Sequence, residues 1–435
     1  MQKHLTVLLL VYSSFWSTTF AQTKTARAEL DVLDYKVILE PNIAQKSLSG
    51  TIMIRFLKKG AASEVAFDCG SLIIDDAKCA ELLSYRQEKQ KLILTLSPMS
   101  QSDYLLAIKY HGTPSRGVSF FPEINQVHSV FHSNEWMVCN IQPADRATVQ
   151  ISLVVPDSLI GIANGRLVEK LRLEQHKLSL TWVHETPIPA YTFGFAIGTF
   201  NYSNKRVGGT SLQYFSQGHT SAELALIFKE SGNMLAFFQQ KTGLNYPLLQ
   251  YNQILGKAEI SQEMSGFTVI RHSYGQQVLK DSTQINLAAH ELAHQWWGNM
   301  VTCRDWGHFW LNEGFAVFMS SAFKEQRFGR AAYLQDIKDY QIEYQKVKDK
   351  GLDKPLVFAN WNNPSAEDRN LVYYKGAYVL HLLREELGDE LFWKGIQQYT
   401  QANFGKAVIT KDFQSAMEKA SQQNLQPFFE QWCYK

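Results

Sequence analysis

The segment HELAHQW, at residues 290–296, combines residue types that bind metal ions with one that moves protons. His290 and His294 are four positions apart, so on a helix both rings project from one face and can bind the same ion at about 2.0 Å. Glu291, beside the first histidine, can reach a water molecule at that ion without binding the ion itself. This HExxH pattern predicts a hydrolytic metal site with Glu291 as general base.

A third ligand is available in WLNEGFAVF, where eighteen residues separate Glu313 from His294. Two histidines and one carboxylate leave a fourth position for water, whose pKa falls to about 7 at a zinc ion. We therefore predict one Zn²⁺ held by His290, His294 and Glu313 in a catalytic rather than a structural site. HExxH alone also arises by chance in amphipathic helices, but the correctly spaced NExxA pattern at Glu313 disfavours that alternative.

The two histidines need a helix that is fixed to a core. Asp281 or Ser282 can cap such a helix, because their side chains accept hydrogen bonds from free backbone N–H groups. The apolar surface of this helix consists of Ile285, Ala288, Ala289, Leu292 and Ala293.

The rest of the second half is also mainly helical in pattern. Residues 220–243 predict one helix between an N-cap threonine and a terminal glycine. Strands are expected at residues 212–216 and 267–273. Further helices are expected to begin near residues 311, 371 and 389 and at Thr410.

Residues 30–200 have the alternating period of β-strands. In residues 34–41 and 50–57, one side of each strand is apolar: Tyr35, Val37 and Leu39 in the first, and Ile52, Ile54 and Phe56 in the second. The pattern continues, between Pro, Gly, Asn and Ser turns, at residues 91–98, 103–112, 147–156, 161–167 and 177–182. We predict an α+β protein with an all-β domain at residues 22–205, followed by a mainly helical catalytic domain at residues 206–435.

The bulk composition agrees with two folded domains and excludes some functions. A chain of 435 residues is too long for one small core. Its 43 basic and 41 acidic side chains leave no broad basic surface, so nucleic acid is not an expected partner. Five cysteines without a CxxC pair indicate neither a disulfide framework nor a thiolate zinc site.

The first 21 residues predict a signal peptide. A short basic region, an apolar run at residues 5–15 and a small-residue cleavage site ending at Ala21 follow one another. The run is shorter than the roughly 20 residues that span a bilayer, and no later segment supplies a transmembrane span. We expect an exported protein, periplasmic or extracellular; the alternative is an uncleaved N-terminal anchor.

With these motifs the chain resembles the aminopeptidase N / leukotriene hydrolase family of zinc metallopeptidases, whose signature is HExxH, eighteen residues and Glu. WMVCNIQPADRATV, IANGRL and PIPAYTFGFAIGTF are similar to its N-terminal domain, and YPLLQYNQIL is similar to the strand that enters its catalytic domain. The resemblance implies a thermolysin-like catalytic domain and aminopeptidase activity on peptides. It also implies a short form without the C-terminal helical domain, in which the cleft is more open or is closed by self-association.

The same resemblance implies an oxyanion donor in LVYYKGAYVL. Tyr373 lies sixty residues after Glu313, where the family has a tyrosine, and Tyr374 stands where the family often has glutamate. A phenol near the ion can donate a hydrogen bond to the developing negative charge. The alternative is that both tyrosines are core aromatics of a helix.

Recognition of the substrate's ammonium is implied for EISQEMSGFTVI, at residues 259–270. The family uses the glutamate of a GxMEN motif, and alignment sets Glu263 at that place. Ile, Ser and Gln at residues 260–262 stand where the glycine-rich part should be, and Met264 replaces the asparagine. The alternative for Glu263 is an exposed strand-end carboxylate.

The resemblance of CNIQPADRA to the family's β domain implies Gln142 as a second amine-binding residue; the alternative is an ordinary loop glutamine. The favoured function is therefore a zinc-dependent aminopeptidase acting on peptides. The alternatives are a zinc peptidase with relaxed or endopeptidase specificity, and a non-hydrolytic peptide-binding or scaffold protein. The sequence does not define an oligomeric state.

Overall fold

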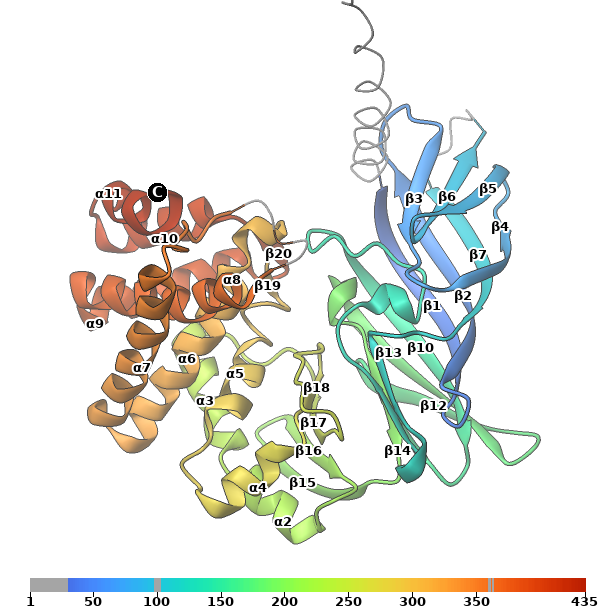
Figure 1. The fold of residues 1–435 in the computed structure, drawn as a ribbon, viewed down its shortest axis with the longest axis horizontal. Coiled ribbons are helices and arrows are strands. Elements are labelled where there is room, and N and C mark those ends of the chain that lie inside the picture. Colours follow the sequence, from blue (N-terminus) through green and yellow to red (C-terminus); the bar gives the residue numbers. More distant parts are fainter. Residues whose placement is uncertain (1–29, 98–102, 359–360, 362–363) are drawn as a thin grey trace, which may run out of the picture.

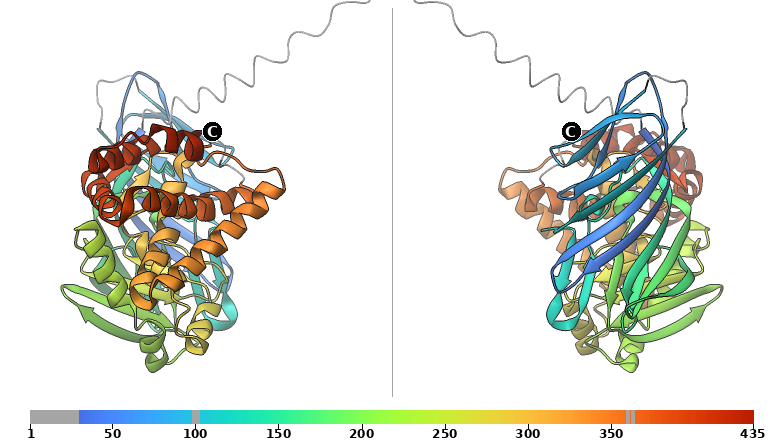
Figure 2. Two further views of the ribbon diagram at one scale, coloured as in Figure 1. Left: turned by 90° about the vertical axis from the view of Figure 1, so that its left-hand side faces the viewer. Right: turned by 90° about the vertical axis from the view of Figure 1, so that its right-hand side faces the viewer.

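The computed structural model describes residues 30–97, 103–358, 361 and 364–435 (Figure 1). The predicted signal peptide, residues 1–21, lies outside the described residues. A β-rich part, residues 30–200, lies beside a helical part, residues 201–435. Two side views show the strands of the first part on one flank and the C-terminal helices of the second on the other (Figure 2). The predicted α+β order is confirmed.

The largest sheet of the β-rich part has seven strands, in the order β12-β13-β10-β1-β2-β7-β4. Only the β1–β10 pair is parallel within it. Its strands are β1 (Leu30–Asn42), β2 (Ser47–Lys58), β4 (Ile73–Lys78), β7 (Asp103–Gly112), β10 (Arg146–Pro156), β12 (Arg166–Leu173) and β13 (Lys177–Pro189). The apolar sides predicted for β1 and β2 face the core, since Tyr35 pairs with Ile54 and Val37 with Ile52, and all four are buried.

Two smaller sheets complete the β-rich part. One has the order β3-β6-β5 and the other β11-β14-β9-β8. Their strands are β3 (Glu64–Asp68), β5 (Leu82–Glu88), β6 (Lys91–Leu96), β8 (Val118–Phe121), β9 (Gln126–Ser129), β11 (Ile160–Ala163) and β14 (Phe195–Gly198). The core of this part continues into the helical part through Ile254, Met264, Phe267, Val269 and Met300. Apolar contact therefore joins the two parts directly.

The helical part begins with a four-stranded sheet, β15-β16-β17-β18, made of β15 (Asn201–Val207), β16 (Thr210–Ser216), β17 (Gln250–Leu255) and β18 (Phe267–Ile270). The predicted domain boundary after residue 205 stays a prediction and falls within β15. The helices of this part are α2 (Ser221–Ile227), α3 (Ser231–Thr242), α4 (Ser273–Lys280), α5 (Asn286–Ala293), α6 (Trp310–Phe328), α7 (Arg330–Asp349), α8 (Ala366–Asn370), the π-helical η5 (Leu371–Lys375), α9 (Gly376–Asn403), α10 (Thr410–Ser421), α11 (Gln426–Phe429) and the π-helical η6 (Glu430–Tyr434). The short strands β19 (Val301–Cys303) and β20 (Lys406–Val408) pair with each other. The 3-10 turns of the two parts are η1 (Pro122–Ile124), η2 (Ser133–Glu135), η3 (Ala190–Thr192) and η4 (Trp306–His308). Within the described residues, none of these helices has the length and apolar character to cross a membrane.

The single helix predicted at residues 220–243 is wrong, because the chain forms two helices there. Thr220 caps α2 as expected, but the helix breaks at residues 228–230 before α3 begins. Phe228 stacks on Tyr214 of β16 with ring centroids 4.9 Å apart, and the Ser231 hydroxyl donates to Gln253 of β17 at 2.6 Å. Packing against the sheet therefore outweighs the continuous helical pattern.

The predicted cap of the histidine helix is also wrong. α5 begins at Asn286, with Ile285 at its N-cap position and no capping side chain. Asp281 instead ends α4, a helix that was not predicted, and its carboxylate accepts a hydrogen bond from the Thr283 N–H at 3.0 Å. Burial of the apolar surface of α5, rather than a cap, fixes this helix.

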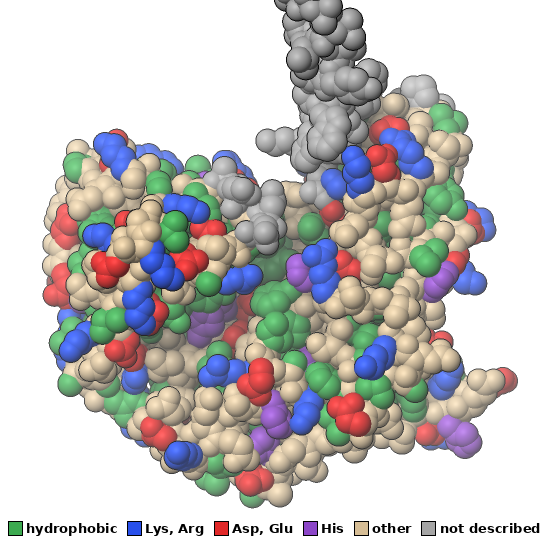
Figure 3. Space-filling view, in the orientation of Figure 1, with side chains coloured by type: hydrophobic (Ala, Val, Ile, Leu, Met, Phe, Trp, Pro, Cys, Tyr) green, Lys and Arg blue, Asp and Glu red, His purple; other side chains and the backbone are tan. Residues whose placement is uncertain are grey.

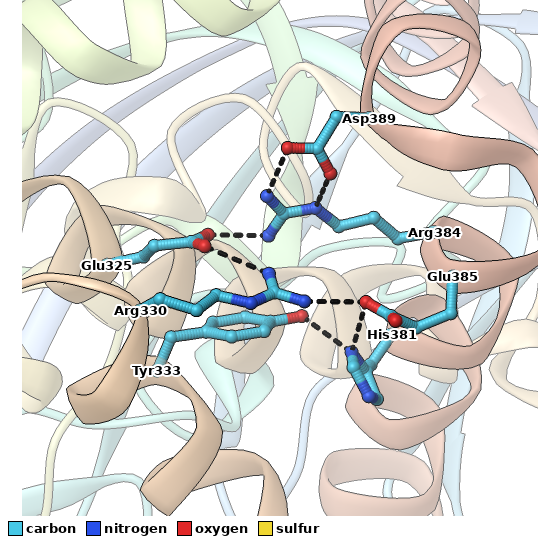
Figure 4. A network of polar contacts seen from close by, with 7 residues as sticks. All are labelled: Glu325, Arg330, Tyr333, His381, Arg384, Glu385 and Asp389. Carbon is cyan, nitrogen blue, oxygen red and sulfur yellow. Dashed lines mark hydrogen bonds and ion pairs between the residues drawn. The ribbon is translucent and has the colours of Figure 1, made fainter.

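A buried arginine holds a kink in α9 against the neighbouring helices (Figure 4). The kink is at Gly388, whose φ of 75° is left-handed. Arg384 donates to both carboxylate oxygens of Asp389, at 2.7 and 2.9 Å, and to Glu325 of α6 at 2.6 Å. Arg330 of α7 donates to the same Glu325 at 2.9 Å. The two halves of α9 are thereby tied to each other and to α6.

Arg384→Met tests this tie. The Arg384 side chain is 4% exposed, so its loss leaves Glu325 without a buried partner, whereas the 67% exposed Asp389 is solvated by water. We expect the free energy of unfolding in urea to fall by about 1–3 kcal/mol. Arg86→Met, which removes the exposed pair with Glu64, is the control and should cost at most about 1 kcal/mol. Equal losses for the two variants would contradict this assignment.

Candidate metal centre

The structure brings the three predicted ligands together. His290 lies in α5, His294 directly follows it, and Glu313 lies in the first turn of α6. The two Nε2 atoms are 3.0 Å apart, and Glu313 Oε2 lies 3.4 Å from the first and 3.3 Å from the second. These three residues offer ligand atoms that all lie within 4.8 Å of one another.

The chemistry of this cluster fits a divalent cation. Glu313 Oε2 is buried and has no hydrogen-bond partner, an arrangement that costs free energy unless a positive charge lies beside it. His294 Nδ1 is 2.9 Å from the Trp297 carbonyl, which can only accept, so Nδ1 carries the hydrogen. His294 Nε2 therefore faces His290 and Glu313, and its lone pair can bind a cation that displaces the proton from this atom.

Three buried carboxyl groups shape the electrostatics of the cluster. Burial disfavours a charged His294, but Glu313 and Glu263 outweigh it and raise the pKa of His294 to about 10. Burial acts against a charged Glu313, yet His294 lowers the pKa of this carboxyl to about 2. Burial, followed by the charge of Glu263, raises the pKa of Glu291 well above its usual value, and burial also raises the pKa of Glu263. The site thus gathers carboxyl groups that disfavour one another's charge, and a cation bound there would relieve this repulsion.

Tyr373 lies beside the ligands. Its ring stacks on that of His290 with centroids 6.0 Å apart. Burial and the nearby Glu313 raise the pKa of Tyr373 well above its usual value, so the hydroxyl keeps its proton. Tyr374 packs elsewhere, on Tyr340 of α7 at a centroid distance of 5.5 Å. Of the two tyrosines, only Tyr373 is thus in a position for the role that the resemblance implies, and the role itself stays a prediction.

Two glycines allow the helices that carry Glu313 and Tyr373 to meet. A Cβ atom on Gly314 would lie 2.9 Å from the Gly376 Cα, and one on Gly376 would lie 3.0 Å from the Gly314 Cα. Lys375, the last residue of the π-helical turn η5, donates a hydrogen bond to Asp353 at 2.8 Å and so stabilises this turn. This close approach sets the distance between the ligand and the tyrosine.

Glu263 lies in the loop between β17 and β18 and is 4% exposed, so the alternative of an exposed strand-end carboxylate is wrong. Asn299 donates to the Glu263 carbonyl at 3.2 Å and Gln295 to the Met264 carbonyl at 3.1 Å, so the loop of Glu263 lies beside the segment that follows the ligand His294. In the space-filling view the surface is hollowed between the two parts, with hydrophobic, acidic and histidine side chains in the hollow (Figure 3).

Gln142 is not joined to this cluster. Its backbone N–H donates to Asn140 Oδ1 at 3.3 Å, and its carbonyl accepts from the Asp145 N–H at 3.0 Å. Across the described ranges, no hydrogen bond connects its side chain to the ligands or to Glu263. The role of Gln142 in binding the substrate's amine stays a prediction.

Sequence reasoning missed the polar residues that hold the ligand segments. Gln295 follows His294 and bonds to the loop of Glu263, and Asn312 precedes Glu313 and donates to the Tyr191 hydroxyl at 3.0 Å. A signal was present, because a polar residue next to a ligand in an otherwise apolar segment needs a buried partner.

Two protein-family models match the chain. The Peptidase M1 N-terminal domain matches residues 32–192, and the Peptidase family M1 domain matches residues 227–432. Aminopeptidase M1 of Arabidopsis thaliana is 27% identical over 308 residues, which are 68% of this chain and 35% of the relative. Aminopeptidase 2, mitochondrial, of Saccharomyces cerevisiae is 23% identical over 442 residues, which are 93% of this chain and 46% of the relative. The chain spans half or less of the length of such curated relatives.

Solved structures resemble the chain over most of its length. The M1 zinc metallopeptidase from Deinococcus radiodurans has a TM-score of 0.78 at 22% identity, covering 92% of this chain and 94% of that one. A complex of a mutant of that protein with a Tyr-Ser-Ala substrate has a TM-score of 0.75 at 22% identity, covering 93% and 94%. At this identity the likeness shows a shared two-part fold.

His294→Ala tests the ligand set. We expect the affinity for Zn²⁺, measured by competition with a chromogenic chelator, to fall by at least about 100-fold, because one of three protein ligands is lost. Added zinc should raise the melting temperature of the wild-type protein and not that of the variant. His176→Ala, at a side chain that is 91% exposed, is the control. Wild-type affinity in the His294 variant would show that the ion binds elsewhere.

Proposed function

Since the chain belongs to peptidase family M1, we propose that it is a zinc-dependent aminopeptidase that hydrolyses the N-terminal bond of peptides. One observation carries this proposal: the buried carboxyl group of Glu263 lies near the His₂Glu ligand set. The buried Glu291 and the protonated Tyr373 lie near the same ligands. Glu263 can bind a free ammonium by charge-assisted hydrogen bonds, and the ligand set with Glu291 and Tyr373 can hydrolyse an amide.

The metal ligands and Glu291 supply the water chemistry. His290, His294 and Glu313 would hold Zn²⁺, which would supply a Lewis acid for polarising the scissile carbonyl and activating water. Glu291 takes the proton of the attacking water and delivers it to the leaving amine. Burial raises the pKa of Glu291, which increases the affinity of its carboxylate for the proton that it takes from the water.

Tyr373 and Glu263 orient the substrate and stabilise its charge. The Tyr373 hydroxyl, kept protonated by burial and nearby carboxylates, donates to the carbonyl oxygen as negative charge develops there. Glu263 accepts hydrogen bonds from the α-ammonium, and a substrate with a blocked amine loses this charge-assisted contact. The peptide bond next to the ammonium is thereby selected.

We also propose export to the periplasm or the extracellular space. The basic, apolar and small-residue order of residues 1–21 supports this proposal.

Glu291→Gln tests the general base. The amide keeps the size of the side chain but cannot take a proton, so kcat for an aminoacyl p-nitroanilide should fall by about 10²–10⁴-fold while the zinc content stays at one ion per chain. Glu174→Gln, at an exposed position of a hairpin, should match the wild type. Full activity in a zinc-loaded Glu291 variant would contradict this mechanism.

A panel of aminoacyl p-nitroanilides and their N-acetylated forms tests the aminopeptidase step. We expect chelator-sensitive cleavage of the free amines alone, and Glu263→Gln should raise KM by about 10–100-fold through loss of a charged hydrogen bond. Equal cleavage of the acetylated forms would favour a relaxed peptidase. No cleavage by zinc-loaded protein would favour a peptide-binding protein.

A further inference from the structure

The loop that carries Glu263 is closed on itself. The Gln262 N–H donates to the Val269 carbonyl at 2.9 Å, and the Val269 N–H donates back at 3.2 Å. Between these residues the chain makes a turn in which the Phe267 N–H donates to the Met264 carbonyl at 3.3 Å. The position of the Glu263 carboxylate therefore depends on what anchors this loop as a unit.

One anchor comes from the β-rich part. Gln262 is 1% exposed, and its Oε1 accepts from the Phe131 N–H at 2.5 Å while its Nε2 donates to the Tyr191 carbonyl at 2.9 Å. Phe131 has a φ of 52°, a left-handed conformation that costs a non-glycine residue free energy. The hydrogen bond that the Phe131 N–H donates to Gln262 helps to hold that turn, so loop and turn stabilise each other.

Tyr191 also reaches the metal ligands. Its hydroxyl donates to the Gly298 carbonyl at 2.8 Å and accepts from Asn312 Nδ2 at 3.0 Å. Asn312 directly precedes the ligand Glu313. A single buried residue of the β-rich part therefore holds the Glu263 loop through its carbonyl and the Glu313 segment through its hydroxyl.

The segment after His294 anchors the same loop from within the helical part. Gln295 accepts from the Gly266 N–H at 3.0 Å and donates to the Met264 carbonyl at 3.1 Å, and Asn299 donates to the Glu263 carbonyl at 3.2 Å. These bonds set the loop relative to α5. Ser265 adds hydrogen bonds to the β-rich part, with Thr192 at 3.2 Å, Asn164 at 2.8 Å and His184 at 3.0 Å. Gln262 bonds instead to Tyr191, the residue that also holds the Glu313 segment.

We propose that Gln262 and Tyr191 are positioning residues that fix the distance between the Glu263 carboxylate and the metal ligands, and so impose the requirement for a free α-ammonium. This inference rests on the proposed aminopeptidase function. The ammonium nitrogen and the scissile carbonyl carbon of a substrate are only two bonds apart. The carboxylate and the metal site must therefore keep their separation to within about 0.5 Å for both ends to be bound at once.

Gln262→Met and Tyr191→Phe test the proposal in the full, zinc-loaded chain. Each keeps the bulk of its side chain and removes one end of the link. The probes are leucine hydroxamate and its desamino analogue, whose dissociation constants are measured by calorimetry. The ratio of the two constants reports the ammonium contact alone. We expect each substitution to reduce the wild-type ratio by about tenfold, with KM for an aminoacyl amide rising more than kcat falls.

The double variant and a control separate positioning from general stability. If both residues belong to one link, the double variant should reduce the ratio little further than either single variant. Gln250→Met removes another hydrogen bond between the two parts, from Gln250 Nε2 to the Gly165 carbonyl at 3.1 Å, and should leave the ratio unchanged. If Gln262→Met does not fold, Gln262→Glu keeps the acceptor for Phe131, loses the donor to Tyr191 and should lower the ratio likewise.

Two results would overturn the inference in different ways. Folded Gln262 and Tyr191 variants that keep the wild-type ratio would remove the positioning role and leave the proposed function intact. A wild-type protein that binds both hydroxamates equally would overturn both, since there would be no ammonium contact to position.

Discussion

A buried carboxylate oxygen with no hydrogen-bond partner is the constraint on which the site depends. Glu313 Oε2 faces two imidazole nitrogens inside the protein, and a charged oxygen in such surroundings needs a cation or a proton beside it. The elements around it bring the three groups together: α5 supplies one histidine and leads directly into the other, and α6 carries the carboxylate in its first turn. The paired glycines at 314 and 376 then admit Tyr373 to the same place.

The β-rich part contributes to this site as well as packing against it. Its core continues into the helical part through Met264, which adjoins Glu263. Met264 replaces a polar residue of the related motif, and its complete burial explains why an apolar side chain is accepted there. Its carbonyl is held by Gln295, and Gln262 on the other side is held by Tyr191. A loop without the glycines of that motif is thus held by hydrogen bonds to both parts.

Local sequence patterns predicted the structural features that depend on residue spacing along the chain. The four-residue step from His290 to His294 and the alternation in β1 and β2 follow from helix and strand geometry, and the structure places these residues as expected. Features set by distant contacts were not predictable in this way. The break at residues 228–230 depends on Tyr214 and Gln253, and the role of Gln262 depends on residues 131 and 191. Asp281 was given to the wrong helix, because α4 ends at this residue and α5 begins only at Asn286, without a capping side chain.

X-ray absorption at the zinc edge tests the central claim most directly, because it reports the atoms that surround the ion. For zinc-loaded protein at neutral pH, a first shell of nitrogen and oxygen at about 2.0–2.2 Å, with two imidazoles and no sulfur, is predicted. Replacement of Glu313 by alanine should remove one light-atom ligand from this shell. A sulfur shell at about 2.3 Å, which would require one of the five cysteines, or a shell unchanged by the Glu313 substitution, would contradict the account.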